Sequence, residues 1–347
     1  MSEIELEDID TKKRLRIVGT FIMSVKSDLL ALLTEHLGNY VSGEEIAERI
    51  GCTRGAVWKA VKALNNEGYN ITGVNNKGYM LGDESDVLDE KAIRDALGKE
   101  YSDMDIHIHK VIDSTNTEIS RLSAAGAKEG TVVIAAEQTA GKGRRGRSFY
   151  SPAESGIYMS VLLRPTLPME QSVRITTAAA SSVAEAIEEV TGVPAGIKWV
   201  NDIYVGGSKV CGILTEASFS IEDNKLDCII LGIGINLYQP DSDFPDDIKN
   251  VAGFICDNKS FSYKNKLIAS IIKHFMTYYS EISIGSYMEA YRKRLLWVGE
   301  NINIISGDNK IPAVLLGVDD ECHLKVRYTD GSEDAVSSGE ISIRLQN

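Results

Sequence analysis

The sequence has little cysteine and no apolar run near the roughly 20 residues that a membrane helix requires. Its five cysteines are odd in number and form no C-x-x-C pair, so neither a disulfide framework nor a zinc site is indicated. Excess positive charge is also lacking: the net charge of −13 argues against general nucleic-acid affinity, so any DNA contact must be local. The apolar stretch 17–23 is too short for a signal peptide, and no cleavage site follows it. We therefore expect a cytoplasmic protein without a membrane segment.

The composition is that of a globular protein with several domains. A length of 347 residues suffices for two or three hydrophobic cores, and 43% hydrophobic with 25% charged residues is ordinary for soluble proteins. The patterns along the chain predict an α+β multidomain protein divided into residues 1–26, 27–82, 83–298 and 299–347. We expect residues 1–26 to be poorly ordered, because they alternate acidic and basic blocks without helical periodicity.

Residues 27–82 carry the pattern of a winged helix-turn-helix. Apolar residues at helical spacing predict a first helix, Ser42 opens a second in a capping box, and Thr53 caps a third. Two short strands, 70–74 and 77–81, then flank an Asn-Asn turn and complete a wing.

The third helix of this domain carries a basic strip. Arg54, Lys59 and Lys62 lie opposite its core face, on the helix that would enter a major groove, and Thr53 stands at its start. We predict that these four residues contact DNA. A protein-interaction or purely structural domain is the alternative, because three cations on one helix are common on solvated surfaces.

The string GKGRRGRS at 141–148 is the most distinctive stretch of the chain. Glycine lets main-chain N–H groups approach a ligand closely, and the cations suit carboxylate or phosphate. The four cations are Lys142, Arg144, Arg145 and Arg147. The glycine spacing matches neither the P-loop nor the dinucleotide-binding pattern. A solvated basic loop, or a patch that meets nucleic acid nonspecifically, is the alternative interpretation.

Polar residues precede this loop. A strand at 106–109 alternates isoleucine with His107 and His109, which lack a third metal ligand and are interpreted as strand-surface residues. Thr115 and Glu118 have capping-box spacing, which predicts a helix to residue 125. Capping alone could explain the polar run Ser114-Thr115-Asn116. A strand-like run from 131 ends at Gln138.

Strands and one helix follow the loop. We expect an alternating strand at 157–163 and a helix at 171–189. Asn201 and Asp202 follow a short strand, and a Gly-Gly hairpin then places Lys209 near the start of the next strand. Gly212 lets another segment approach that strand closely. A lone lysine beside a hairpin is otherwise usually exposed to solvent.

The remaining sequence predicts a buried strand at 226–235 that ends at Asn236, and then an irregular loop at 238–251. Loops of that length are uncommon unless they act as lids or are disordered. Helices are expected at 264–280 and 286–296. Beyond 299, short strands separated by turn residues suggest an SH3-like barrel.

Together these motifs closely resemble the biotin protein ligases, and in particular the bifunctional kind that also acts as the biotin operon repressor. The resemblance is carried by DSTN at 113–116, GKGRRGR at 141–147, KWVND at 198–202 and KVCGIL at 209–214, in that order. Val200 stands where family members commonly have proline. Because the resemblance begins just after Met23, we hypothesise that Met23 is the physiological start. The resemblance also implies that residues 83–298 form a mixed-sheet α/β ligase domain like that of class II aminoacyl synthetases and lipoate ligases.

The resemblance implies three sets of site residues. Biotin would contact Ser114, Thr115, Asn116, Gln138, Gly141, Lys142, Gly143, Arg144, Lys209 and Gly212. ATP or the adenylate would contact Arg144, Arg145, Arg147, Phe149, Asn201 and Asn236. Catalysis would depend on Lys142, Arg144, Asp202 and Lys209, and no protein metal ligands are predicted.

The implied reaction uses biotin, ATP and Mg²⁺. Biotin would attack the α-phosphate, and the resulting biotinyl-5′-AMP would donate biotin to a lysine of a biotin carboxyl carrier protein, the acetyl-CoA carboxylase subunit. The adenylate-bound protein would form a homodimer on palindromic operator DNA. Two alternatives stay open: a ligand-sensing transcription factor without catalysis, and a lipoate-protein ligase.

Overall fold

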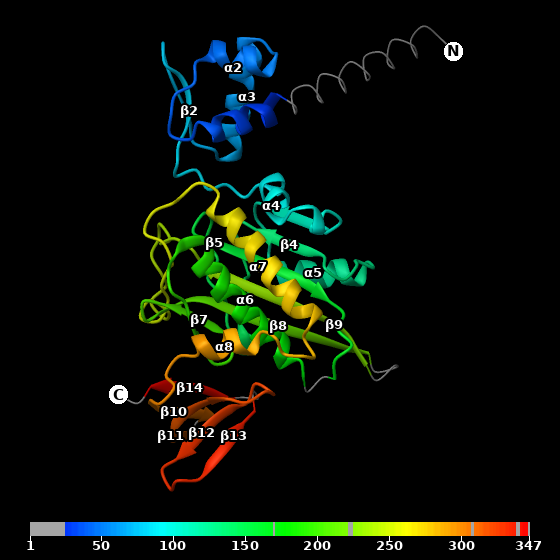
Figure 1. The fold of residues 1–347 in the computed structure, drawn as a ribbon, viewed down its shortest axis with the longest axis vertical. Helices are drawn as coiled ribbons and strands as arrows, with labels where there is room; N and C mark the ends of the chain where they lie inside the picture. The colour runs from blue at the N-terminus through cyan, green and yellow to red at the C-terminus, as the bar shows by residue number, and fades with distance from the viewer. Residues whose placement is uncertain (1–24, 169–170, 221–224, 307–308, 338–340, 346–347) are drawn as a thin grey trace, which may run out of the picture. The chain divides into compact units, whose positions relative to one another are not determined.

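The computed structural model describes residues 25–168, 171–220, 225–306, 309–337 and 341–345 (Figure 1). The chain forms two compact units, Met1–Val87 with Asn258–Ser262, and Leu88–Asp257 with Tyr263–Asn347. The expectation of poor order for residues 1–26 lies outside the described residues up to 24, as does the hypothesis of a start at Met23, but residues 25 and 26 begin a helix and contradict it there. No described helix is long and apolar enough to cross a membrane.

The first unit is the helix-turn-helix with its wing. It contains a helix at 25–35, α2 (Gly43–Ile50), α3 (Arg54–Glu67), and the hairpin of β1 (Ile71–Val74) and β2 (Gly78–Leu81). Buried apolar residues from all of these elements form one core. The order and the approximate bounds of the elements agree with the sequence prediction.

Both predicted helix starts of this unit are confirmed. Ser42 Oγ accepts a hydrogen bond from the Glu45 N–H at 3.1 Å, and Thr53 Oγ1 accepts one from the Ala56 N–H at 3.2 Å. Each bond satisfies an N–H group that has no partner inside its helix. Thr53 therefore sets where α3 begins, and with it the position of the basic strip.

The second unit is built on a seven-stranded mixed sheet. Only β3 and β4 are parallel neighbours, and every other described pair in the sheet is antiparallel. In spatial order the strands are β3 (Ile106–His109), β4 (Val132–Ala135), β5 (Gly156–Leu163), β9 (Lys225–Asn236), β8 (Ser208–Ser220), β7 (Asp202–Val205) and β6 (Gly196–Lys198).

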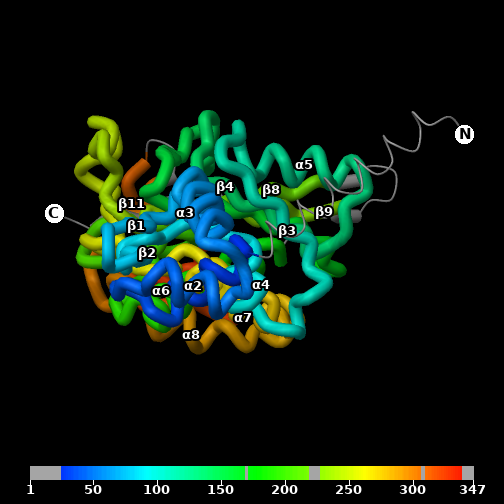
Figure 2. Tube along the Cα trace, turned by 90° about the horizontal axis from the view of Figure 1, so that it is seen from above, coloured from blue at the N-terminus to red at the C-terminus, as the bar shows by residue number. Residues whose placement is uncertain are grey.

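Helices cover both faces of this sheet (Figure 2). Helix α5 (Thr115–Ala124) packs on one face, whereas α6 (Val173–Thr191) and α7 (Tyr263–Ser280) lie against the other. All eight residues of β5 are consequently buried. The prediction that β5 alternates between core and surface was wrong, because the helix on its second face could not be read from the strand itself.

Several element bounds differ from the prediction. The sequence at 87–97 predicts a helix, but α4 (Glu90–Leu97) begins three residues later because Asp89 caps it, with Oδ1 accepting from the Ala92 N–H at 2.7 Å. Helix α6 begins at Val173, and α8 (Met288–Arg294) is shorter than the predicted 286–296. The strand before the basic loop ends at Ala135, not at Gln138.

The C-terminal part of this unit is a small SH3-like domain. Its antiparallel sheet has the order β13-β12-β11-β10-β14. The strands are β10 (Asn301–Ser306), β11 (Asn309–Val318), β12 (Leu324–Tyr328), β13 (Glu333–Val336) and β14 (Ile341–Leu345). Its buried residues, such as Leu315 and Val326, belong to the same hydrophobic cluster as the large sheet. The structure therefore confirms the predicted SH3-like architecture of this part of the chain.

Candidate active site

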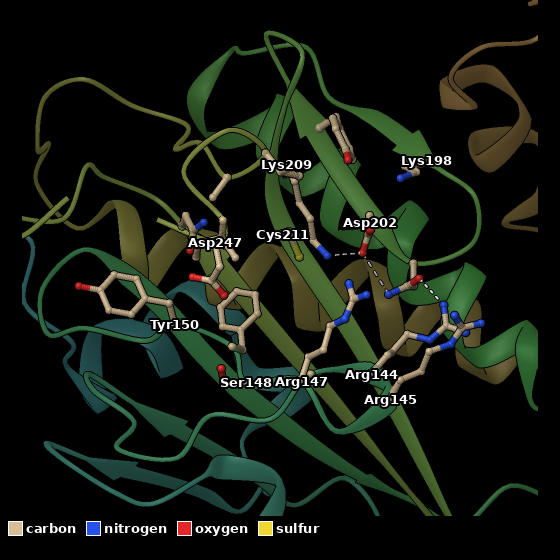
Figure 3. A pocket seen from close by; sticks show the side chains of 18 of the residues that line it. Arg144, Arg145, Arg147, Ser148, Tyr150, Lys198, Asp202, Lys209, Cys211 and Asp247 are labelled. Carbon is tan, nitrogen blue, oxygen red and sulfur yellow. Dashed lines mark hydrogen bonds and ion pairs between the residues drawn. The ribbon is translucent and has the colours of Figure 1, made fainter. Parts of the chain in front are cut away.

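A cavity of about 580 Å³ opens at the ends of β7, β8 and β9 (Figure 3). The basic loop lines one side of it, and Asp247, Ile248 and Val251 of the predicted lid line another. Ile305 and Lys310, on β10 and β11 of the SH3-like domain, complete its rim. The cavity therefore collects side chains from segments that are far apart in the sequence.

The basic loop is folded tightly on its own backbone. The N–H of Gly143 donates to the Arg147 carbonyl at 2.7 Å, and the N–H of Phe149 donates to the Gly141 carbonyl at 2.9 Å. A Cβ on Gly141 would lie 2.5 Å from the Phe149 carbonyl oxygen, so only glycine fits there. Arg145, at φ 59°, turns the chain inside the loop.

Arg144 is the cation of this loop that is held most firmly. Its Nη1 donates to Asn201 Oδ1 at 2.7 Å. Burial lowers the pKa of its guanidinium, an effect that the nearby Asp202 carboxylate opposes. The group nevertheless stays charged at any physiological pH, because an arginine begins far above that range. The site therefore contains a partly desolvated, permanent positive charge.

Asp202 lies between two of the predicted site residues. The Nζ of Lys209 lies 2.6 Å from Asp202 Oδ1, and Asn201 Nδ2 donates to that same oxygen at 3.1 Å. Figure 3 shows Lys209 pointing toward Asp202 across the cavity wall. Arg144, Asn201, Asp202 and Lys209 thus form one connected row, and the lysine side chain is only 30% exposed. Lys209 is therefore half-buried and ion-paired at the cavity wall, and it is not a freely solvated lysine.

A bulge in β8 brings Lys209 to this wall. Asp202 pairs with Gly212, but Tyr204 pairs with Lys209, so β8 contains one more residue than its partner between these two pairs. Simple alternation would place Lys209 and Gly212 on opposite faces of the sheet. The extra residue reverses the alternation, and both residues face the side that carries Asp202.

Phe149 separates this cavity from a second, smaller pocket. A Cβ on Gly234 would lie 2.6 Å from Phe149 Cε1, and one on Gly212 would lie 3.3 Å from Phe149 Cε2. The ring therefore rests on two glycines of neighbouring strands, and it meets Tyr158 edge to face. Phe149 lines both pockets.

The smaller pocket, of about 20 Å³, collects most of the predicted biotin contacts. Its lining includes Ser114, Thr115, Asn116, Gln138, Lys142 and Gly212. Gly143, Arg144 and Lys209, which were predicted for the same ligand, do not line it. Gly143 and the two cations line the larger cavity instead, and Gly141, the first residue of the loop, is buried and lines neither pocket.

The side chains of the smaller pocket bond to one another. Gln138 Oε1 accepts from the N–H and the hydroxyl of Thr115 at 2.8 and 3.1 Å, and Gln138 Nε2 donates to Ser151 Oγ at 2.9 Å. Ser160 Oγ lies 2.8 Å from Thr115 Oγ1 and 2.6 Å from Asn116 Oδ1. Paired donors and acceptors of this kind suit a neutral polar ligand.

The predicted capping role of Thr115 was wrong. Ser114 is the N-cap of α5, without a capping bond from its side chain, and Thr115 is the first helical residue. The Thr115 hydroxyl is directed to Gln138 instead. Helix capping therefore does not explain why hydroxyl groups stand at these two positions.

Asn236 and the segment 238–251 line the other side of the larger cavity. Asn236 Nδ2 donates to the Gly253 carbonyl at 3.1 Å. The backbone of Lys209 bonds to Val251 and Gly253 at 2.7 and 2.8 Å, which ties the end of this segment to β8. The Trp199–Val200 peptide, next to Asn201, is cis.

Two residues in or beside these pockets were given no role by the sequence. Lys198 is buried in the larger cavity wall, with Nζ 5.4 Å from the Trp297 ring and 5.8 Å from the Tyr204 ring. Glu216, on β8, accepts a hydrogen bond from Asn116 of the smaller pocket. Its sequence position offered one signal, because it alternates with Gly212 and Leu214, which line that pocket.

Metal binding by the histidines is not supported. His107 Nε2 lies 3.0 Å from Asp105 Oδ2, on an edge strand. Among the described residues, no group of three or more His, Cys, Asp or Glu side chains could hold a metal ion.

The basic strip of the first unit is exposed. Arg54, Lys59 and Lys62 all lie at the surface of α3, and none forms an ion pair with another described residue. Trp58 between them is 55% exposed, with Lys62 Nζ 5.5 Å from its ring. Thr53 is exposed as well, although its hydroxyl caps the helix.

Comparison with protein families gives matches to three family models. Residues 25–80 match an HTH domain, 108–236 match the biotin/lipoate A/B protein ligase family, and 298–344 match the biotin protein ligase C-terminal domain. The chain is 33% identical over 322 residues to the bifunctional ligase/repressor BirA of Bacillus subtilis, covering 91% of this chain and 98% of that protein. The BirA of Escherichia coli is 28% identical over 326 residues, covering 92% and 98%.

A solved structure also resembles this chain. The biotin protein ligase of Aquifex aeolicus in complex with biotin and ATP superimposes with a TM-score of 0.58 at 27% identity. The similarity covers 70% of this chain and 99% of that one.

Proposed function

This chain belongs to the family of bifunctional biotin ligase/repressors, and from that premise we propose how its own residues perform both activities. As a ligase, it activates biotin with ATP and transfers it to a lysine of a biotin carboxyl carrier protein. As a repressor, it binds operator DNA of biotin-synthesis genes. One observation carries the proposal: a row of Arg144, Asn201, Asp202 and Lys209 lies beside a small neutral pocket, with Phe149 between them.

In the first step, a carboxylate oxygen of biotin attacks the α-phosphorus of ATP and pyrophosphate leaves. Both reactants are anions, so the barrier contains their mutual repulsion. Lys209 and Arg144 offset it with fixed charges aimed at the reacting groups, and Lys142, Arg145 and Arg147 bind phosphate oxygens from the loop. The neutral ureido ring of biotin pairs with the hydroxyl and amide groups of the smaller pocket.

The smaller pocket must widen to admit this ring, since about 20 Å³ holds no more than a water molecule. Phe149 is the side chain that the two pockets share. We place it under the adenylate, with Asn236 facing the adenine. Both ends of the Asn201 amide are in use, so it acts on the adenylate mainly by holding Arg144 and Asp202.

The chain offers a partial donor set for Mg²⁺. Asp202 and Asp247 line the cavity, and Mg²⁺ is commonly held by one or two carboxylates together with substrate phosphates. These residues fit an ion that arrives on ATP. When bound, Mg²⁺ would neutralise phosphate charge, and Asp202, already held by Lys209 and Asn201, would help to place it.

In the second step, the uncharged amine of the carrier lysine attacks the acyl carbon and AMP leaves. The mixed anhydride is already reactive, so the enzyme supplies orientation and exclusion of water rather than a nucleophile. Closure of the 238–251 segment over the cavity would provide that exclusion. Its Asp247, Ile248 and Val251 already line the wall.

For repression, Thr53, Arg54, Lys59 and Lys62 meet the DNA. The three cations are exposed on α3 without ion-pair partners among the described residues, which leaves their charge available to phosphates. We propose that two copies of the adenylate-bound chain bind a palindromic operator, because a two-fold dimer presents paired recognition helices.

Transfer of labelled biotin tests the proposal. Purified protein, carrier protein, Mg²⁺ and ATP are incubated with radiolabelled biotin or lipoate, with ATP omitted in the control. The proposal predicts label on the carrier from biotin only, and only with ATP. Label from lipoate instead would identify a lipoate ligase, and a biotin complex without any label on the carrier would leave a ligand-sensing transcription factor.

A further inference from the structure

Glu216 does not itself line the smaller pocket, but it contacts two residues that do, Asn116 and Lys142. It lies on β8, and its Oε2 accepts from Asn116 Nδ2 at 2.6 Å. Its Oε1 lies 3.8 Å from Lys142 Nζ in the basic loop. The side chain is 39% exposed, so it is neither a free surface charge nor a sealed core group.

The Asn116 amide is fixed in orientation by its surroundings. Asn116 is 4% exposed, and Ser160 Oγ lies 2.6 Å from its Oδ1. A Cβ on Gly232 would lie within 2.2 Å of that same oxygen, so the side chain has no room to move toward β9. Its Nδ2 must then find an acceptor on the opposite side, and Glu216 is that acceptor.

A carboxylate at this place needs an explanation beyond the hydrogen bond. The proposed ligands are a carboxylate and a triphosphate, which an additional negative charge repels. A neutral oxygen, such as that of glutamine, would satisfy Asn116 equally well. What a neutral oxygen would not do is attract the Lys142 ammonium across 3.8 Å.

We propose that Glu216 is a positioning residue that couples the biotin pocket to the basic loop. One carboxylate oxygen of Glu216 fixes the Asn116 amide in the pocket, and the other attracts the Lys142 ammonium. Biotin binding and loop placement are thereby linked through a single side chain. This inference rests on the proposed ligase function.

Two substitutions separate the two halves of the proposal. Glu216→Gln keeps an oxygen for Asn116 and removes the charge that faces Lys142. Glu216→Leu removes both. Biotin-dependent ATP–pyrophosphate exchange is measured for each variant as a function of biotin, with thermal unfolding recorded alongside. Asp227→Asn, on the neighbouring strand β9 and outside both pockets, is the matched carboxylate-to-amide control.

The expected results differ in KM and kcat. For Glu216→Leu we expect the KM for biotin to rise about tenfold to a hundredfold, because Asn116 loses its acceptor. For Glu216→Gln the KM should stay within about threefold of wild type while kcat falls about threefold to tenfold. In a Lys142→Met background, Glu216→Gln should lower kcat no further, because the partner of the charge is already gone.

The coupling would be overturned by a folded Glu216→Leu variant with the wild-type KM for biotin, or by an equal rise in KM in both variants. It would also be overturned if Glu216→Gln lowered kcat as much in the Lys142→Met background as in the wild type. If Glu216→Leu fails to fold, the glutamine variant and the double substitution decide alone. Failure of the proposed function would look different, because the wild-type protein would then show no biotin-dependent exchange.

Discussion

Two basic clusters in this chain differ in how one cation is held: three of the four loop cations are exposed, as those of α3 are, but Arg144 is not. On α3, Arg54, Lys59 and Lys62 are exposed and form no ion pair with another described residue. In the loop at 141–148, Arg144 is partly desolvated and bonds to Asn201 at 2.7 Å. Mobile, hydrated cations suit a long polyanion, whereas a fixed cation suits one small anion in one place. The surroundings of a cation, and not its sequence, therefore distinguish the two functions.

The largest expected effect comes from removing the fixed charges. We expect Arg144→Ala and Lys209→Ala each to slow biotinyl-5′-AMP formation about a hundredfold to a thousandfold, as loss of a preorganised charge does in other active sites. Single-turnover adenylate formation measures this. Lys128→Ala, an exposed cation on the same unit, is the control. Wild-type turnover in both site variants would refute these roles.

A conservative exchange should sharpen the contrast. Arg144→Lys keeps the charge but loses the planar fork that reaches Asn201, so we expect adenylate formation to fall about tenfold. Lys62→Arg, the reverse exchange on α3, should leave operator affinity within about twofold, because a hydrated phosphate contact tolerates either cation. Adenylation assays and DNA-binding titrations test the pair. Equal sensitivity at both positions would mean that the two clusters do not differ.

Removing an exposed cation of α3 should weaken DNA binding and reduce the dependence of that binding on salt concentration. For Lys59→Ala and Lys62→Ala we expect operator affinity to fall a few-fold, with the slope of log affinity against log salt reduced by about one per protomer. Adenylate formation should be unchanged in both variants. Fluorescence titrations at several salt concentrations measure the slope. A slope that equals the wild-type slope would place these lysines away from the DNA.

The smallest effect is expected at the start of α3. Thr53→Ala removes the hydrogen bond to the Ala56 N–H and should cost about 1 kcal/mol of stability in the first unit. Thermal unfolding followed by circular dichroism measures this. A Thr53→Ser variant keeps the acceptor and should behave as wild type. If Thr53→Ser lowers the stability of the first unit as much as Thr53→Ala does, loss of the capping hydrogen bond is not the cause.

Local signals in the sequence predicted local features well. The caps at Ser42 and Thr53 and the wing hairpin follow from neighbouring residues, and the structure has all of them. The large cavity and the placement of Lys209 do not follow from neighbours. The bulge in β8 reverses the alternation between Lys209 and Gly212, and only pairing with β7 reveals it.

The motifs predicted which residues form the site, but not which of these residues contact one another. The sequence identified Asn201, Asp202 and Lys209, but not that they form one row with Arg144. Glu216 was missed because its one signal, alternation with Gly212 and Leu214, places it on their side of the strand but does not indicate a contact. Its proposed role depends on its hydrogen bond with Asn116, which lies a hundred positions earlier in the chain. Contacts at that separation depend on the order of strands in the sheet.

The most direct test of the central claim is the position of the phosphate in a crystal structure with a non-hydrolysable analogue of biotinyl-5′-AMP. We expect the phosphate mimic about 3 Å from Lys209 Nζ and from the guanidinium of Arg144, with the ureido ring between Thr115 and Gln138. A bound analogue whose phosphate mimic lies in solvent, with Arg144 still directed only at Asn201, would contradict the account.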